Sequence, residues 1–268
     1  MSEFIMLLPK TYCALAVSLA LTSSFVSAES FEDPLRTFDE SRWWLSDGWE
    51  NGFPFLSRWD AKSATFNKKG LTLTLAPDDE RGADGKLTFY GGELRSHEFF
   101  PYGCYEIDMK PARAPGVVSS FFLFSGPYDK PEGGSGKHNE IDIEFLGSNT
   151  NMVQLNFWTD DDSYTNSHET LIFLGFDASK AFHRYGIYWG EDRIEWFIDG
   201  QLVLRVNNSP YDPTPSTESS YLRVMANIWA TDPEIANWAG KFREDKVREY
   251  RAKYRNFSFK ENERCTTK

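Results

Sequence analysis

The sequence predicts an all-β protein, built as a two-sheet antiparallel sandwich. Short runs that alternate apolar and polar residues recur along the chain, and clusters of glycine, proline and other turn residues separate them. No long amphipathic helix and no strand–helix–strand rhythm interrupts this pattern. The length of 268 residues fits a single sandwich domain. We therefore expect one β-rich domain in which one sheet curves around an open cleft.

Clean alternation predicts the individual strands. They cover residues 71–75, 105–109, 184–190, 193–199, 201–206 and 221–229. Turns at Gly190-Glu191-Asp192 and Asp199-Gly200 make the segment from 184 to 206 an antiparallel meander. The charges of residues 245–254 also fit a helix, but Tyr254, Phe257 and Phe259 favour a strand at the end of the chain.

The N-terminus resembles a secretory signal peptide. Lys10 precedes an apolar stretch from about Ala14 to Val26, and Val26-Ser27-Ala28 resembles a small-residue cleavage site. We expect removal of residues 1–28, a single domain over 29–268, and a secreted or periplasmic protein. A membrane tether is the alternative, although the stretch is short for a span. Export permits a disulfide, so Cys104 and Cys265 could pair or could simply be buried.

Composition limits the class of partner. A formal net charge of −11 argues against nucleic acid and anionic membranes, whose phosphates attract clustered Lys and Arg. The basic residues between 241 and 260 are interleaved with acids, which predicts a solvated face. The chain has 9 Trp, 12 Tyr and 22 Phe, and many stand beside Asn, Asp or Gly. Most belong to the core, but exposed rings would suit the apolar faces of sugars.

The most informative segment is Glu140-Ile141-Asp142-Ile143-Glu144-Phe145, where every second residue is acidic. Side chains alternate between the faces of a strand, so Glu140, Asp142 and Glu144 share one face. Like charges this close repel and compete for protons, which indicates a functional reason for their presence.

Two carboxyl groups facing one bond are the requirement of glycoside hydrolysis. Glu140 and Glu144 are four residues apart, roughly 13 Å along a strand, and their side chains can lean toward each other. Carboxyl groups about 5 to 5.5 Å apart would retain the anomeric configuration, and a wider gap would invert it. A solvated edge strand or a cation site is the alternative interpretation.

The chain resembles glycoside hydrolase family 16, and within it the bacterial lichenases, which are endo-β-1,3-1,4-glucanases. The resemblance extends from about Phe38 to Phe259 and includes residues 46–49, 92–96, 102–106, 109–112, 118–122, 140–147, 174–177 and 227–229. It implies a concanavalin A-like β-jelly-roll sandwich, a cleft across the concave sheet and a retaining mechanism. It also implies that Glu140 is the nucleophile, that Glu144 is the general acid/base, and that Asp142 tunes their protonation.

The resemblance implies further sugar-contacting residues. They are Glu93, Arg95, Asn156, Trp158, Asn227, Trp229 and Trp238. Glu93 and Arg95 could instead be an ordinary surface pair, and Trp229 and Trp238 could belong to the core. Alternation places either Phe122 and Phe124 or their neighbours toward the cleft, and we assign Phe122 and Phe124 to it.

Departures from the lichenase pattern leave substrate choice open. His138-Asn139 replaces the usual Trp before the acids, and His138 could stack on sugar, donate a hydrogen bond or simply end the loop. The loop at 131–137 is longer and richer in glycine. Ser57 and Gly91 replace the lichenase cysteines, and Arg255 replaces a calcium-binding Asp, so we expect no metal and no cofactor.

The predicted function is that of a secreted, endo-acting β-glucanase, acting on mixed-linkage β-1,3-1,4-glucan as a monomer. Its only predicted partner is the polysaccharide. A depolymerase or transglycosylase of another polymer, such as a bacterial exopolysaccharide or xyloglucan, is the alternative within enzymes. A non-catalytic sugar-binding sandwich is the alternative outside them.

Overall fold

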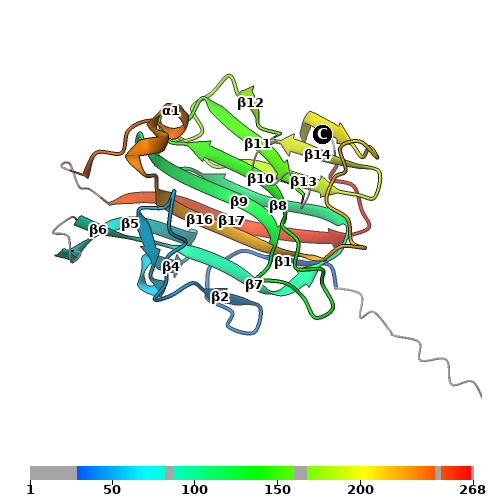
Figure 1. Ribbon diagram of the computed structural model, residues 1–268, viewed down its shortest axis with the longest axis horizontal. Coiled ribbons are helices and arrows are strands. Elements are labelled where there is room, and N and C mark those ends of the chain that lie inside the picture. Colours follow the sequence, from blue (N-terminus) through cyan, green and yellow to red (C-terminus); the bar gives the residue numbers. More distant parts are fainter. Residues whose placement is uncertain (1–28, 82–86, 160–167, 245–248, 267–268) are drawn as a thin grey trace, which may run out of the picture.

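The computed structural model describes residues 29–81, 87–159, 168–244 and 249–266. The predicted signal peptide, residues 1–28, lies outside the described residues. Two sheets stacked face to face form the framework of the described chain, and Figure 1 shows β9, β10 and β11 running side by side across the molecule. The predicted all-β sandwich is confirmed.

The first sheet has seven strands in the order β12-β11-β10-β9-β16-β7-β2. Their bounds are β2 Trp43–Leu45, β7 Glu93–Phe100, β9 Val117–Ser125, β10 Asn139–Leu146, β11 Met152–Trp158, β12 Thr170–Phe173 and β16 Leu222–Ala230. Every pairing in this sheet is antiparallel. β10 is an interior strand, paired with β9 on one side and β11 on the other.

The second sheet has ten strands, of which eight follow the order β15-β14-β13-β8-β17-β5-β6-β3, while β1 pairs with β17 and β4 with β5. Their bounds are β1 Phe31–Asp33, β3 Ser57–Trp59, β4 Ala64–Asn67, β5 Gly70–Arg81, β6 Leu87–Gly91, β8 Gly103–Lys110, β13 His183–Trp189, β14 Arg193–Ile198, β15 Gln201–Asn207 and β17 Tyr250–Glu261. Helical segments are short: α1 Ala236–Ala239 and the 3-10 turns Ala61–Ser63 and Pro233–Ile235. No helix in the described ranges is long and apolar enough to cross a membrane.

The strands predicted from alternation are present. The meander from 184 to 206 corresponds to β13, β14 and β15, which pair antiparallel in sequence order. The chain continues as a strand from Tyr250 to Glu261, so the terminal strand is confirmed and the helical interpretation is wrong for residues 250–254. Residues 245–248 lie outside the described chain. Ala252, Tyr254 and Phe257–Phe259 are buried against the core. This burial favours a strand more strongly than the local charges favour a helix.

The core between the sheets is rich in aromatic side chains, and polar contacts cross it to the strands of the seven-stranded sheet. Trp196 of β14 donates its indole N–H to the backbone carbonyl of Asp142 at 3.0 Å. The Tyr254 hydroxyl of β17 lies 3.0 Å from the backbone carbonyls of both Ser120 and Asn227. Because buried polar groups are costly when unpaired, these contacts fix the ten-stranded sheet against the strands that carry the predicted acids.

Cys104 and Cys265 form a disulfide between the start of β8 and the segment after β17. Beside it, Arg264 pairs with Glu195 of β14, whose side chain is fully buried and also accepts hydrogen bonds from Arg193 and Arg205. The cystine packs against Phe197 and Tyr188. The C-terminal segment is therefore fastened to the ten-stranded sheet by one covalent and one ionic contact.

Candidate active site

β10 presents the three acids on the face opposite the core. Ile141, Ile143 and Phe145 are fully buried between the sheets, so Glu140, Asp142 and Glu144 must point outward. The pairing of β10 with β9 and β11 is continuous from Glu140 to Glu144, without a bulge. The predicted common face is confirmed, and the strand is regular across all three acids.

A cavity of about 250 Å³ lies on this outer face of the seven-stranded sheet. Its lining comes from β7, β9, β10, β16 and the segment before β3: Asn51, Phe55, Glu93, Arg95, Ser120, Phe122, Phe124, His138, Glu140, Asp142, Glu144, Met225, Asn227 and Trp229. All three acids line the cavity. A solvated edge strand is therefore ruled out, because β10 is interior and the Asp142 side chain is only 3% exposed.

Burial and mutual repulsion separate the protonation states of the acids. Burial, followed by the charge of Glu140, raises the pKa of Glu144 from 4.5 to about 8, although hydrogen bonds from Gln154 and Ser120 oppose the shift. Burial and the charges of Glu140 and Glu144 raise the pKa of Asp142 well above its ordinary value, and its hydrogen bond to Glu140 adds to the effect. At neutral pH, Glu144 therefore holds a proton, and the environment of Asp142 favours its protonated form.

Glu144 is oriented by a chain of two hydrogen bonds. Gln154 of β11 donates from Nε2 to Glu144 Oε2 at 3.0 Å, and Trp238 of α1 donates from Nε1 to Gln154 Oε1 at 2.9 Å. Because Gln154 is itself buried, its amide is held in one orientation. The protonated Glu144 is thus fixed at the wall of the cavity.

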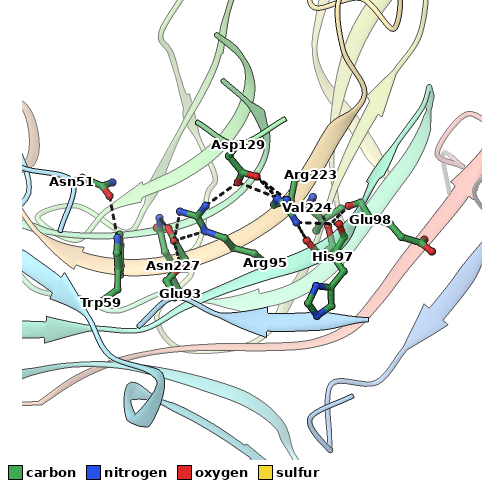
Figure 2. A network of polar contacts seen from close by, with 12 residues as sticks. Asn51, Trp59, Glu93, Arg95, His97, Glu98, Asp129, Arg223, Val224 and Asn227 are labelled. Carbon is green, nitrogen blue, oxygen red and sulfur yellow. Dashed lines mark hydrogen bonds and ion pairs between the residues drawn. The ribbon is translucent and has the colours of Figure 1, made fainter. Parts of the chain in front are cut away.

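A second polar cluster lies on β7 and β16 (Figure 2). Glu93 accepts hydrogen bonds from Ser46 Oγ at 2.7 Å, from Arg95 Nε at 2.7 Å and from Asn227 Nδ2 at 3.0 Å. The Glu93 side chain is only 2% exposed, so these donors offset the cost of burying its carboxyl group. The alternative of an ordinary surface pair is wrong for Glu93 and Arg95.

Asp129, in the loop between β9 and β10, extends the same cluster. It accepts from Arg95 Nη1 at 2.8 Å and from Arg223 Nη2 at 2.7 Å, as Figure 2 shows. Each of the two arginines is 8% exposed. One loop carboxylate thus compensates two buried guanidinium groups from neighbouring strands, and the loop is held at the end of the cavity.

Aromatic rings complete the cavity wall. Phe121 and Leu123 are buried in the core, whereas Phe122 and Phe124 line the cavity, as predicted. Trp229 also lines it and stacks on Phe55 with ring centroids 4.0 Å apart. These flat apolar surfaces beside carboxyl groups are suited to bind a saccharide.

The strands that line this cavity lie within the part of the chain that a protein-family model matches. The model of the glycosyl hydrolases family 16 matches residues 53–248, which include every strand that lines the cavity. The chain belongs to glycosyl hydrolases family 16. The predicted family membership is confirmed, and the chain is identified as a glycoside hydrolase.

Family 16 members of known name resemble the chain over most of its length. A β-glucanase of Paenibacillus macerans is 36% identical over 228 residues, covering 85% of this chain and 87% of that protein. The structure of the Bacillus licheniformis β-glucanase superposes with a TM-score of 0.74 at 32% identity, covering 88% and 99% of the two chains. A prokaryotic β-1,3-1,4-glucanase (lichenase) from a mouse hindgut metagenome has the same TM-score and identity, with coverage of 86% and 98%.

Three predicted sugar-contacting residues do not line the cavity. Asn156 is 2% exposed, hydrogen bonds to Asp142, and accepts from the backbone N–H of His168 at 2.9 Å. Trp158 stacks on His138, and Trp238 holds Gln154 while packing beside Trp229. Asn156 lies on the predicted face of the sheet but is buried, whereas Trp158 of β11 and Trp238 of α1 are half-buried, so sugar contact by these three side chains stays a prediction.

His138 lies at the cavity wall with its Nε2 only 2.6 Å from Glu140 Oε2. The sequence left three roles open for His138: stacking on sugar, donating a hydrogen bond, or simply ending the loop. The structure shows a hydrogen bond.

Sequence reasoning missed several contributors. Gln154 stands two residues before Asn156 on the same strand, so period-2 alternation would have placed it on the same face. Asn51 and Phe55 lie in an irregular segment, and Asp129 lies in a loop, where no periodic pattern exists to indicate direction.

No cluster of three or more His, Cys, Asp or Glu side chains with metal-binding geometry occurs in the described part of the chain. Arg255, at the place where the calcium-binding Asp was expected from the resemblance, pairs with Asp108 at 3.2 Å. Ser57, at the place of one lichenase cysteine, accepts a hydrogen bond at its Oγ from the backbone N–H of Ala230 in β16, at 3.0 Å.

Proposed function

We propose that the protein is a secreted, endo-acting, retaining β-glucanase whose substrate is mixed-linkage β-1,3-1,4-glucan. The observation that carries this proposal is the set of three carboxyl groups on one face of β10, at the wall of an aromatic-lined cavity. The lichenase named in the structural comparison supports the choice of linkage. Proteins of Paenibacillus macerans and Bacillus subtilis that are similar in sequence are named β-glucanases, which supports the choice of polymer.

In this proposal Glu140 is the nucleophile and Glu144 the general acid/base. Glu140 attacks C1 of the sugar while Glu144 gives its proton to the departing glycosidic oxygen, and a glycosyl-enzyme ester forms. The raised pKa of Glu144 favours this assignment, because a general acid must be protonated before the reaction begins. Asp142 hydrogen bonds to Glu140, and burial together with the charges of Glu140 and Glu144 raises the pKa of Asp142, which favours a proton on the residue between them.

Internal cleavage is favoured by the extent of the cleft. A second hollow of about 760 Å³, lined by Trp44, Trp49 and Tyr128 among others, shares Asn51, Arg95 and Phe124 with the first cavity. Together they form a groove that is longer than one sugar ring. Glu93, Asn227 and Trp229 are proposed to contact the saccharide in this groove.

The decisive experiment is a product profile of the mature protein on barley β-glucan, lichenan, laminarin, carboxymethyl cellulose, xyloglucan and succinoglycan. We expect rapid viscosity loss and short oligosaccharides from the first two only. Cleavage of xyloglucan or succinoglycan alone, or transfer to a sugar acceptor, would replace the proposed substrate. Binding without turnover on every polymer would favour a sugar-binding sandwich.

Glu140→Ala tests the assigned nucleophile. Removal of a covalent nucleophile costs several orders of magnitude in kcat, roughly 10⁴-fold or more, while the far-UV spectrum should stay unchanged. Azide should restore activity toward an activated aryl glycoside and should give a glycosyl azide of inverted configuration. Normal activity of the variant would assign the nucleophile elsewhere.

Export is proposed from the apolar N-terminal segment and the disulfide, because disulfides persist in oxidising compartments. Expression of the full chain in a bacterial host should release a protein that starts near Glu29, as N-terminal sequencing would show. Retention of the intact N-terminus in a membrane fraction would indicate a tether. Size-exclusion chromatography tests the proposed monomer.

A further inference from the structure

His138 forms a short hydrogen bond to Glu140. The distance from His138 Nε2 to Glu140 Oε2 is 2.6 Å, in the short range that is typical of a charge-assisted hydrogen bond. The two side chains are only 13% and 21% exposed, so bulk water screens this contact weakly.

Packing on both sides holds the imidazole in place. The ring stacks on Trp158 of β11, with an interplanar angle of 19° and centroids 6.2 Å apart, and it packs against Phe124 of β9 at 5.6 Å. Phe124 and Trp158 are the two residues that pair with Glu140 across the sheet. The loop end is fixed as well, because the Asn139 amide donates to the carbonyl of Lys137 at 3.2 Å. The imidazole therefore reaches Glu140 from a position set by three strands.

We propose that His138 is a positioning residue: it donates a hydrogen bond from Nε2 to Glu140, holds this carboxylate in one orientation, and stabilises the charge that returns to it in the second step of the reaction. This inference rests on the proposed function, in which Glu140 is the nucleophile. Asp142 hydrogen bonds to Glu140 as well, so the carboxylate lies between two donors.

The other charged groups around Glu140 explain why it needs a donor. Those that line the cavity are Glu93 and Arg95 of β7 and Asp142 and Glu144 of β10, while β9 and β16 contribute Ser120, Phe122, Phe124, Met225, Asn227 and Trp229, which carry no charge. Glu169, at the end of the segment before β12, acts on Glu144 from the β11 side. Arg95 is already bonded to Glu93 and Asp129. His138 thus offers Glu140 a donor from outside the acid strand.

In the second step of the reaction negative charge returns to Glu140, and this change makes the effect of the His138 hydrogen bond on the rate measurable. Water adds to C1 of the glycosyl-enzyme, Glu144 takes the water proton, and the C1–O bond to Glu140 breaks with its electron pair returning to the carboxylate. The hydrogen bond from His138 is stronger to this carboxylate than to the ester, so it assists the departure of Glu140. Without the donor, the glycosyl-enzyme should accumulate.

The test compares His138→Phe with His138→Gln. Phenylalanine keeps a ring against Trp158 but has no donor, whereas glutamine keeps an N–H donor. For the phenylalanine variant we expect kcat to fall about ten-fold, KM to fall with it, and the acidic limb of kcat/KM to move up by about one pH unit. The glutamine variant should recover most of kcat and of the acidic limb. Full activity of the phenylalanine variant, with an unmoved acidic limb, would reduce the role of His138 to packing.

A measurement that needs no turnover tests the hydrogen bond itself. In protein labelled with ¹⁵N-histidine, the Nε2 resonance of His138, assigned by its loss in His138→Phe, should shift when Glu140 is changed to Gln. An unchanged resonance in folded Glu140→Gln would overturn the inference. If the wild-type protein cleaves no polysaccharide, the proposed function fails, but the resonance still decides whether His138 bonds to Glu140.

Discussion

Replacement of Glu144 by Gln should make the stability of the protein less dependent on pH. Glutamine has the same shape as the protonated carboxyl group and can still accept the hydrogen bond from Gln154 at the wall of the cavity. The substitution removes a group whose pKa is raised from 4.5 to about 8 by folding. It therefore isolates the effect of one titration on the free energy of unfolding.

The sign and size of the effect follow from proton linkage. Below pH 4.5 the group is protonated in both states; between 4.5 and about 8 the unfolded chain loses the proton and the folded protein keeps it. The wild-type protein should thus lose stability over this window, and the loss should level off above pH 8. At 1.36 kcal/mol per pKa unit the limit is about 5 kcal/mol, and because Glu144 faces an open cavity we expect about 2 to 4 kcal/mol.

Urea denaturation followed by tryptophan fluorescence at pH 5, 7 and 9 measures this difference. Glu144→Gln should lose about 2 to 4 kcal/mol less than wild type between pH 5 and pH 9. Glu191→Gln is the matched control, because Glu191 is an exposed carboxylate in the turn between β13 and β14, and it should follow wild type. Parallel losses in wild type and Glu144→Gln would refute the raised pKa.

Three other substitutions test the framework around the site. Changing Cys104 and Cys265 to Ser opens a loop of 161 residues and should lower the free energy of unfolding by about 3 to 5 kcal/mol in urea, and an unchanged midpoint would contradict a structural disulfide. Asp129→Asn removes the shared partner of two buried guanidinium groups, including that of Arg223. We expect the free energy of unfolding to fall by about 3 kcal/mol and KM to rise. A normal thermal midpoint and a normal KM would contradict the shared pairing. Gly147→Ala would place a Cβ 2.4 Å from a backbone oxygen after β10, so we expect a loss of about 1 to 3 kcal/mol by calorimetry, and no loss would show that the backbone can yield.

Alternation along strands predicted most of the architecture and the heart of the site. The burial of Ile141 and Ile143 fixes the opposite direction for the acids, and this required only the period of a strand and an apolar core. The meander was predictable because its turns are short and rich in glycine and aspartate. These features depend on local sequence.

Depth and long-range partners were not predictable in the same way. Asn156 shares a face with Asp142, but its burial depends on what covers the neighbouring strand, which no local pattern contains. Asp129 meets Arg223 across 94 positions of the sequence, and one loop conformation brings them together. The resemblance that supplied the roles of the acids could not supply the contact of His138, because His138 is where the chain departs from that pattern.

The single strand that carries the acids also has a practical consequence for protein engineering. The backbone of β10 joins the reactive carboxyl groups directly to Ile141 and Ile143, which pack against the far sheet. Replacing either isoleucine by a larger or smaller residue to raise heat tolerance would move that backbone by fractions of an ångström. The carboxyl groups of the same strand would shift with it, and the activity would change. Thermostabilising libraries should therefore spare these two positions and concentrate on the outer surface of the ten-stranded sheet, away from the groove.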